Sequence, residues 1–218
     1  MEAPRLPAVK HFDAQYCSMK RRPYTLRQRA ESQAQTRQRI IEAAVELHGT
    51  LGPAHTTMSA VAERAGVQRH TLYRHFPDEL AVLRACSQHF IGSHPHPDFQ
   101  AWGRVAPGRR RLGKGLAELY AYFTTNRQMI GNVLRDAEFV PVGAGFRQAA
   151  EEAARTLADG WRVESPERLH SALHLATDFF AWRLLADAGL EPSSAAGLMT
   201  DMVAGAVRTS TRSRRPRK

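Results

Sequence analysis

A run of polar side chains between residues 68 and 75 carries the hydrogen-bonding groups that proteins use on nucleic acids. The side chains are Gln68, Arg69, His70, Thr71, Tyr73, Arg74 and His75. Leu72 and Phe76 lie one helical turn apart, so in a helix they share one face and the polar side chains cover the rest of the surface. Guanidinium, amide, hydroxyl and imidazole groups bond to phosphate oxygens and to base edges in a major groove. The pattern predicts a helix that binds DNA.

A second group of reactive side chains, His170, His174 and Asp178, recurs at four-residue steps along one edge of an expected helix. Two imidazoles and a carboxylate at this spacing could ligate a divalent metal, which would indicate a metal-dependent helical enzyme. The alternative is a polar seam beside a helix contact, with the two imidazoles hydrogen-bonded. We favour the seam because no fourth ligand or general base is evident nearby. We therefore predict no enzyme activity, no catalytic residue, no metal and no cofactor.

Three helices are expected to hold the DNA-reading residues. The first is amphipathic, begins at about residue 32 and ends at Gly52-Pro53. Thr57 is the expected N-cap of a short second helix, because its hydroxyl can accept a bond from a free backbone N–H, and we also expect it at the DNA surface. Gly66 ends that helix by adopting a positive φ, and Pro77 ends the third. The arrangement predicts a helix-turn-helix.

The segment from Thr36 to about Cys86 resembles the N-terminal domain of the TetR/AcrR family of transcriptional regulators. The matching residues are Thr57, Val61, Ala62, Ala65, Gly66, Val67, Thr71, Leu72, Tyr73, His75 and Phe76. The resemblance implies that Thr71, Tyr73 and His75 touch the DNA backbone or nearby bases. It also implies that Arg69 and His70 sit against the major groove.

Three positions depart from the family pattern. Glu79 stands where a lysine often grips a phosphate at the start of the fourth helix, and a carboxylate lacks that donor. His48 stands where an aromatic core residue is common, and it is either a buried neutral imidazole or a displaced surface residue. His70 is bulkier than the small residue often found there, and it either touches a base or fills space.

The net charge of +10 is concentrated at the two ends of the chain. Residues 1–30 hold seven Lys or Arg against two acids, residues 208–218 hold six against none, and residues 31–207 hold 18 against 19. Basic tails attract polyanions without selectivity, so a non-specific nucleic-acid-binding protein acting through its tails is a further alternative. That alternative leaves the pattern at residues 71–73 unexplained. Met19, followed by three basic residues, is an alternative start of the chain.

The remaining sequence predicts an all-α fold of about nine helices, because convincing alternating strands are absent apart from a weak signal at 139–142. The expected organisation is a basic flexible arm (1–31), a helix-turn-helix DNA-binding domain (32–78), a helical effector-binding and dimerisation domain (79–207) and a basic tail (208–218). Two cysteines, Cys17 and Cys86, exclude a disulfide framework. No apolar run approaches the length of about 18 residues that a membrane span needs, so we expect a cytoplasmic protein.

The expected helix from Pro166 to Ala188 has two apolar stripes. One stripe holds Leu169, Leu173, Ala176, Phe180 and Leu184, and the other holds Leu175, Phe179 and Trp182. We expect the second stripe to pack against a symmetric partner, together with Leu198, Met202 and Val203. Such a homodimer would present two reading helices to a palindromic operator, roughly 34–36 Å apart.

In the family, the middle helices enclose a pocket for a small inducer. The candidates in this chain, several of which are equally suited to a core, are Trp102, Tyr120, Phe123, Met129, Trp161, His174 and Asp178. The predicted function is a ligand-responsive transcriptional regulator, in the first instance a repressor. It would bind a double-stranded DNA operator as a dimer and be released by a small apolar or amphipathic effector. The sequence specifies neither the operator nor the effector.

Overall fold

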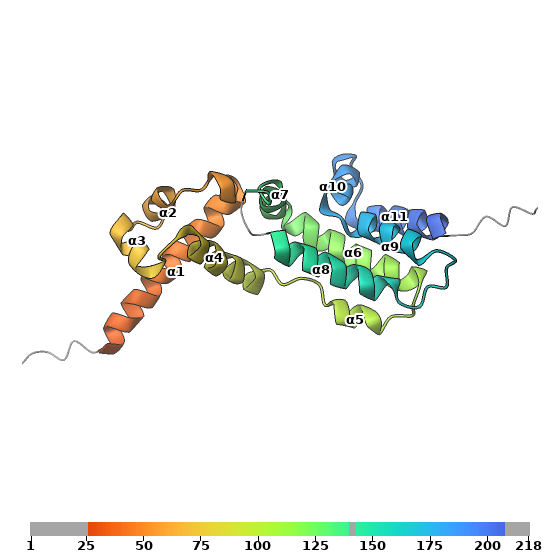
Figure 1. Ribbon diagram of the computed structural model, residues 1–218, viewed down its shortest axis with the longest axis horizontal. Helices are drawn as coiled ribbons and strands as arrows, with labels where there is room; N and C mark the ends of the chain where they lie inside the picture. Colours follow the sequence, from red (N-terminus) through yellow and green to blue (C-terminus); the bar gives the residue numbers. More distant parts are fainter. Residues whose placement is uncertain (1–25, 140–142, 208–218) are drawn as a thin grey trace, which may run out of the picture. The chain divides into compact units, whose positions relative to one another are not determined.

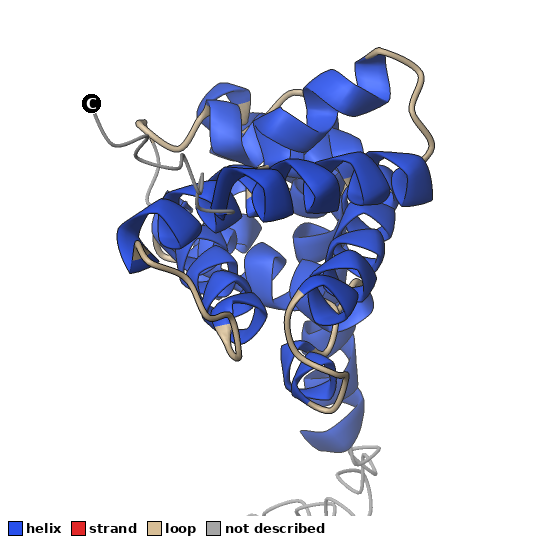
Figure 2. Cartoon of the chain, turned by 90° about the vertical axis from the view of Figure 1, so that its right-hand side faces the viewer, coloured by secondary structure: helices blue, strands red, loops and turns tan. Residues whose placement is uncertain are grey.

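The computed structural model describes residues 26–139 and 143–207. Within these ranges the chain forms eleven α-helices and one short 3-10 helix, with no strand (Figures 1 and 2). The all-α prediction is confirmed, although the helices outnumber the expected nine. Three predicted features lie wholly or mostly outside the described ranges: the weak strand signal at 139–142, the expected arm and the basic tail. In the described part of the chain, no helix is long and apolar enough to cross a membrane.

The first helices surround one small core. They are α1 (Leu26–Thr50), the 3-10 helix η1 (Pro53–His55), α2 (Met58–Arg64), α3 (Arg69–His75) and α4 (Glu79–Ser93). The core comprises Ile40, Ile41, Ala43, Ala44, Met58, Val61, Ala62, Ala65, Leu72, Phe76, Val82, Leu83, Ala85 and Cys86. Helix α1 begins at Leu26 rather than near residue 32, because its polar first turns are rich in Arg, Gln, Ala and Glu, which favour helix without any apolar stripe.

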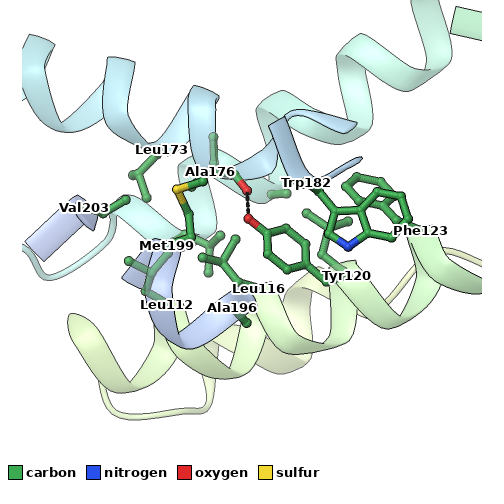
Figure 3. Packing of buried hydrophobic residues seen from close by; sticks show 14 of the residues in the cluster. Leu112, Leu116, Tyr120, Phe123, Leu173, Ala176, Trp182, Ala196, Met199 and Val203 are labelled. Carbon is green, nitrogen blue, oxygen red and sulfur yellow. Dashed lines mark hydrogen bonds between the residues drawn. The ribbon is translucent and has the colours of Figure 1, made fainter. Parts of the chain in front are cut away.

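The remaining helices enclose a second, larger core. They are α5 (Phe99–Gly103), α6 (Arg109–Thr125), α7 (Arg127–Arg135), α8 (Gly143–Ala158), α9 (Pro166–Thr177), α10 (Phe179–Asp187) and α11 (Pro192–Val207). Helix α6 packs along α11, and α8 packs along α9. Figure 3 shows α6 side chains Leu112, Leu116 and Tyr120 meeting residues of α9 and α11. The Tyr120 hydroxyl donates a hydrogen bond to the Ala176 carbonyl oxygen at 2.8 Å.

The expected single helix from Pro166 to Ala188 is in fact two helices, which corrects the prediction. Asp178 has extended backbone angles, φ −75° and ψ 133°, and its carboxylate accepts a hydrogen bond from Ala181 N at 2.8 Å as the N-cap of α10. The break changes the helical phase, so Phe179 and Trp182 turn into the core while Phe180 and Leu184 are exposed. An aspartate that favours capping over helix interior explains the interruption.

The break also corrects half of the predicted dimer surface. Phe179, Trp182 and Val203 are at most 3% exposed and belong to the chain's own core, so they offer no surface to a partner. The other three predicted contacts, Leu175, Leu198 and Met202, are exposed. They are joined by two exposed side chains of α10 that were expected to point inward, Phe180 and Leu184.

Candidate nucleic-acid interface

Helix α2 begins and ends with backbone signals that the sequence contains. The Thr57 hydroxyl accepts a hydrogen bond from Ala60 N at 3.1 Å and caps the first turn. At the other end, Gly66 N donates to Glu63 O and Val67 N donates to Ala62 O, the paired bonds of a Schellman motif. Gly66 has φ +64°, which a side chain would disfavour. The turn therefore delivers α3 in a defined direction.

Two side chains anchor α3 to the core. Leu72 is fully buried and Phe76 is 2% exposed, and the Arg37 guanidinium lies 4.8 Å from the centre of the Phe76 ring. Helix α3 has seven residues, so these anchors, rather than its own hydrogen bonds, hold it in place. The face opposite Leu72 is consequently held in a fixed orientation.

That opposite face carries the predicted DNA contacts. Gln68, Arg69, His70, Tyr73 and Arg74 are exposed, as is Thr57 at the start of α2, while Thr71 and His75 are half-buried. No acidic residue occurs between residues 68 and 77, so the face is cationic. The Arg69 guanidinium lies 6.0 Å from the centre of the Tyr73 ring, and the Thr71 hydroxyl lies 3.3 Å from His70 Nε2.

His75 lies closer to the core than its neighbours on α3. Its Nε2 atom is buried without a hydrogen-bond partner among the described residues. Burial, reinforced by the positive charges of Arg74 and Arg37, lowers the pKa of the imidazole. His75 is therefore a neutral side chain at the edge of the α3 surface, so it does not add a charge there near neutral pH.

The start of α4 is built from two acidic residues. The Asp78 carboxylate accepts a hydrogen bond from Ala81 N at 2.7 Å, and Glu79 occupies the first turn with its side chain exposed. Both negative charges favour the positive end of the helix dipole. The acidic residue at position 79 is thus explained by helix stability.

His48 is a buried imidazole rather than a surface residue. It is 7% exposed, and its Nδ1 atom lies 3.2 Å from the Cys86 sulfur. Burial lowers the pKa of His48 to about 4, against the smaller opposing effect of Asp136. Of the two alternatives left open by the sequence, the structure shows the neutral buried imidazole.

The end of α7 is hydrogen-bonded to the end of α1. Asn132 Nδ2 donates to Gly49 O at 2.8 Å and to His48 O at 3.3 Å, and Arg135 Nη2 donates to Leu51 O at 2.9 Å. The Asp136 carboxylate accepts from Ala54 N at 3.0 Å. We call Asn132 and Arg135 of α7, together with the C-cap residue Asp136, the α7 clamp.

The clamp satisfies backbone groups that α1 leaves unpaired where it ends. Arg135 Nε donates a hydrogen bond to the Asp136 carboxylate at 2.8 Å. This bond keeps the pKa of the Asp136 carboxyl below its ordinary value. Gly52, with φ +100°, passes so close to Arg135 and Asp136 that a Cβ there would overlap both side chains. The clamp therefore requires glycine at this position.

The first helices contain a segment that matches a known protein family. Residues 40–86 match the family model described as "Bacterial regulatory proteins, tetR family". We call these matched residues, 40–86, the tetR-family segment. The resemblance found in the sequence is thereby confirmed, and the matched residues contain α2, α3 and the residues that anchor them.

Curated relatives align with the tetR-family segment. The chain is 39% identical over 71 residues to the HTH-type transcriptional regulator SrpR of Pseudomonas putida, an alignment covering 33% of this chain and 32% of SrpR. It is 35% identical over 71 residues to the HTH-type transcriptional regulator TtgR of the same species, covering 33% of this chain and 34% of TtgR. The alignments thus span about a third of each of these relatives.

Solved structures resemble more of the chain. NalD, the secondary repressor of the MexAB-OprM multidrug efflux pump in Pseudomonas aeruginosa, aligns with a TM-score of 0.56 at 22% identity, covering 83% of this chain and 99% of NalD. A TetR-like transcriptional regulator from Rhodococcus sp. RHA1 aligns with a TM-score of 0.55 at 17% identity, covering 78% and 93%. Because the identities are low, these structures show a shared fold alone. Their coverage shows that the shared fold includes residues beyond the tetR-family segment.

Two of the cavities among the described residues contain members of the predicted ligand pocket, but only part of it. The larger, of about 400 Å³, is lined by Met129, whereas the smaller, of about 130 Å³, is lined by Phe123 and Asp178. Trp102 and Tyr120 are fully buried, and they line neither cavity.

The other two predicted pocket residues also lie away from these cavities. Trp161 is half-buried against the larger core and donates from Nε1 to Leu157 O at 3.0 Å. His174 is half-buried on α9. Sequence patterns did not indicate the cavity residues His96 and Tyr122. His96 lies in the segment between α4 and α5, and Tyr122 lies on α6.

The possible metal ligands are not brought together. His170 Nε2 lies 3.1 Å from His174 Nε2, as expected for a hydrogen-bonded seam, but the Asp178 carboxylate caps α10. Among the described residues, no group of three or more His, Cys, Asp or Glu side chains is arranged to hold a metal ion. The two imidazoles thus lie as the seam predicts, and the Asp178 carboxylate is engaged at the start of α10.

Proposed function

We propose that this protein is a DNA-binding transcriptional regulator that reads a palindromic operator as a homodimer. The observation that carries the proposal is the cationic, donor-rich face of α3, held outward by Leu72 and Phe76. Arg69, Thr71 and Tyr73 offer hydrogen bonds to phosphates and base edges, and an α-helix fits the major groove. The tetR-family segment supports the same role.

A small effector would regulate the protein by releasing it from the operator. The larger cavity lies beside α4 and α7, the smaller is also lined by α7, and the α7 clamp connects that helix to the end of α1. A ligand that prefers a conformation with misplaced reading helices would weaken operator binding. We propose that the protein represses transcription by occupying the operator. An uncharged or amphipathic small molecule would release it.

Replacing Thr71 or Tyr73 with Ala tests the reading surface. Each change should weaken operator binding about tenfold, because each removes a hydroxyl contact at the DNA while leaving the Leu72 and Phe76 anchors in place. The operator is first selected from random duplexes with the unmodified protein. Affinities are then measured by gel shift at one fixed salt concentration.

Thr124→Ala is the matched control for Thr71→Ala. The Thr124 hydroxyl bonds to the Tyr120 carbonyl oxygen of its own helix, α6, far along the chain from α3. We expect this variant to bind the operator like the unmodified protein. Unchanged operator affinity in both α3 variants, with the fold retained by circular dichroism, would refute the proposed reading surface.

A further inference from the structure

The two cavities are neighbours that share part of their walls. The larger is lined by residues of α1, α4, α7 and α8, and the smaller by residues of α5 to α10. His96 and Phe146 line both. The larger volume, about 400 Å³, lies within the range of small-molecule sites. A single elongated molecule could therefore extend from one cavity toward the other past these two rings.

A buried hydroxyl without a partner lies in the wall of the smaller cavity. Tyr122 is 9% exposed, and its hydroxyl oxygen is buried with no hydrogen-bond partner among the described residues. Burial raises the pKa of Tyr122 to about 12, so the hydroxyl keeps its proton and can donate. Buried polar groups are nearly always paired, so an orphan hydroxyl in a cavity wall indicates a missing acceptor.

Aromatic rings line the smaller cavity together with Tyr122. The His96 ring centre lies 4.9 Å from that of Tyr122 and 6.1 Å from that of Phe146. Phe99, Phe123 and Phe179 line the same cavity. Rings at these separations accept further rings by offset or edge-to-face contact, which favours an aromatic ligand.

The buried titratable groups that line the cavities are uncharged near neutral pH. Burial lowers the pKa of His96, lowers that of His48 to about 4 and raises that of the Cys86 thiol to about 12. The ionic side chains of the walls, Arg84, Arg147 and Asp178, are exposed. An ion placed between the rings would lose its hydration without gaining a buried counter-charge.

We propose that these cavities bind an uncharged aromatic molecule whose carbonyl oxygen accepts a hydrogen bond from the Tyr122 hydroxyl. The regulatory meaning of this site rests on the proposed function, since the ligand would be the effector. The binding itself does not depend on DNA. The site differs from the predicted one, because Tyr122 and His96 replace Trp102, Tyr120 and Trp161 as the deciding contacts.

Three naphthalene derivatives of similar size test the chemistry. They are 2-acetylnaphthalene, which has an acceptor, 2-ethylnaphthalene, which has none, and 2-naphthoate, which is anionic. Titration calorimetry on the full chain without DNA should show the ketone binding about 5- to 10-fold tighter than the ethyl compound, as one buried hydrogen bond predicts. The naphthoate should bind most weakly.

Two tyrosine variants on α6 assign the contact. Tyr122→Phe should abolish the preference for the ketone while leaving the affinity for 2-ethylnaphthalene within about twofold. Tyr120→Phe is the matched control, since its hydroxyl already donates to Ala176 O and lines neither cavity. This control should retain the preference.

Several results would overturn the assignment: equal binding of the ketone and ethyl compounds to the unmodified protein, tightest binding of the naphthoate, or no binding of any of the three. A ketone preference that survives Tyr122→Phe would also contradict it. A ligand that binds as predicted without releasing DNA would instead refute the effector part of the proposed function. Unchanged operator affinity in the Thr71 and Tyr73 variants would refute the proposed reading surface and would leave the binding result intact.

Discussion

The contact between His48 and Cys86 shows how one polar residue can be accommodated in an apolar core. The imidazole Nδ1 and the thiol sulfur are 3.2 Å apart, and Cys86 also donates to Leu83 O at 3.1 Å. Burial disfavours both the imidazolium and the thiolate, so the pair is neutral. A neutral imidazole contributes a pH dependence to the stability of the protein.

His48→Phe tests that dependence. The pKa of His48 falls from 6.5 to about 4 on folding, so the unfolded chain binds the extra proton first as pH falls. Stability is therefore lost on acidification across that interval, by about 3 kcal/mol for this residue alone. The variant should show a flatter loss of unfolding free energy in urea titrations between pH 6.5 and pH 4.

The difference between the two proteins isolates His48 because the other histidines with lowered pKa values, His75 and His96, are present in both. Phenylalanine conserves an aromatic ring, and the bonds from Asn132 reach the backbone of residue 48 rather than its side chain. Parallel stability curves for both proteins would show that His48 is not buried as a neutral group.

At the scale of elements, α7 joins two parts of the molecule. Ile130 and Leu134 line the smaller cavity and Met129 and Val133 the larger. The clamp residues at the end of the same helix bind the end of α1. A ligand that shifts α7 would therefore act on backbone groups beside the reading helices. This geometry makes α7 the element through which we expect effector binding to act on DNA binding.

Asn132→Ala should weaken this coupling more than it weakens either binding step. It removes the two bonds to His48 O and Gly49 O but no cavity or α3 residue. We expect the factor by which a saturating ligand lowers operator affinity to fall by about 5-fold, which corresponds to ~1 kcal/mol of coupling. The measurement is a gel shift with and without ligand.

Gln128→Ala on the same helix removes an exposed amide and serves as the control. It should keep the full effect of the ligand. If Asn132→Ala retained the coupling of the unmodified protein, α7 would not be the connecting element through this residue.

At the scale of the whole molecule, a group of large apolar side chains is left uncovered by residues 26–139 and 143–207. Leu175, Phe180, Leu184, Leu198 and Met202 of α9, α10 and α11 are between 43% and 72% exposed. Apolar surface of this kind is stabilised by burial against a partner, and a symmetric pair buries the same residues twice. We propose that these five residues form the dimer surface that the proposed function requires.

Leu184→Glu should convert the dimer to a monomer at micromolar concentration, because a carboxylate at the most exposed of these positions would be buried without a counter-charge. Sedimentation velocity distinguishes the monomer from the dimer. Operator affinity should fall as the dimer is lost. Leu51→Glu, at an exposed leucine that follows α1, is the control and should remain dimeric. A Leu184→Glu protein that sediments as a dimer would place the interface elsewhere.

Local signals in the sequence were enough to place the reading helix and to predict its exposed face. Thr57, Gly66 and the pair Leu72 and Phe76 act within a few residues of themselves, through capping, backbone conformation and helical period. The all-α class follows from the same short-range periods. These features need no knowledge of distant contacts, so the sequence alone predicts them.

Only the tertiary structure decided which apolar residues face the core, where the cavities lie and how α7 meets α1. The break at Asp178 reverses the roles of Trp182 and Leu184, although both lie on apolar stripes in an unbroken helix. Asn132 binds a carbonyl 83 residues earlier in the chain, and helix packing buries the Tyr122 hydroxyl where none of the described residues pairs with it. Such properties depend on contacts between distant segments, which no local period encodes.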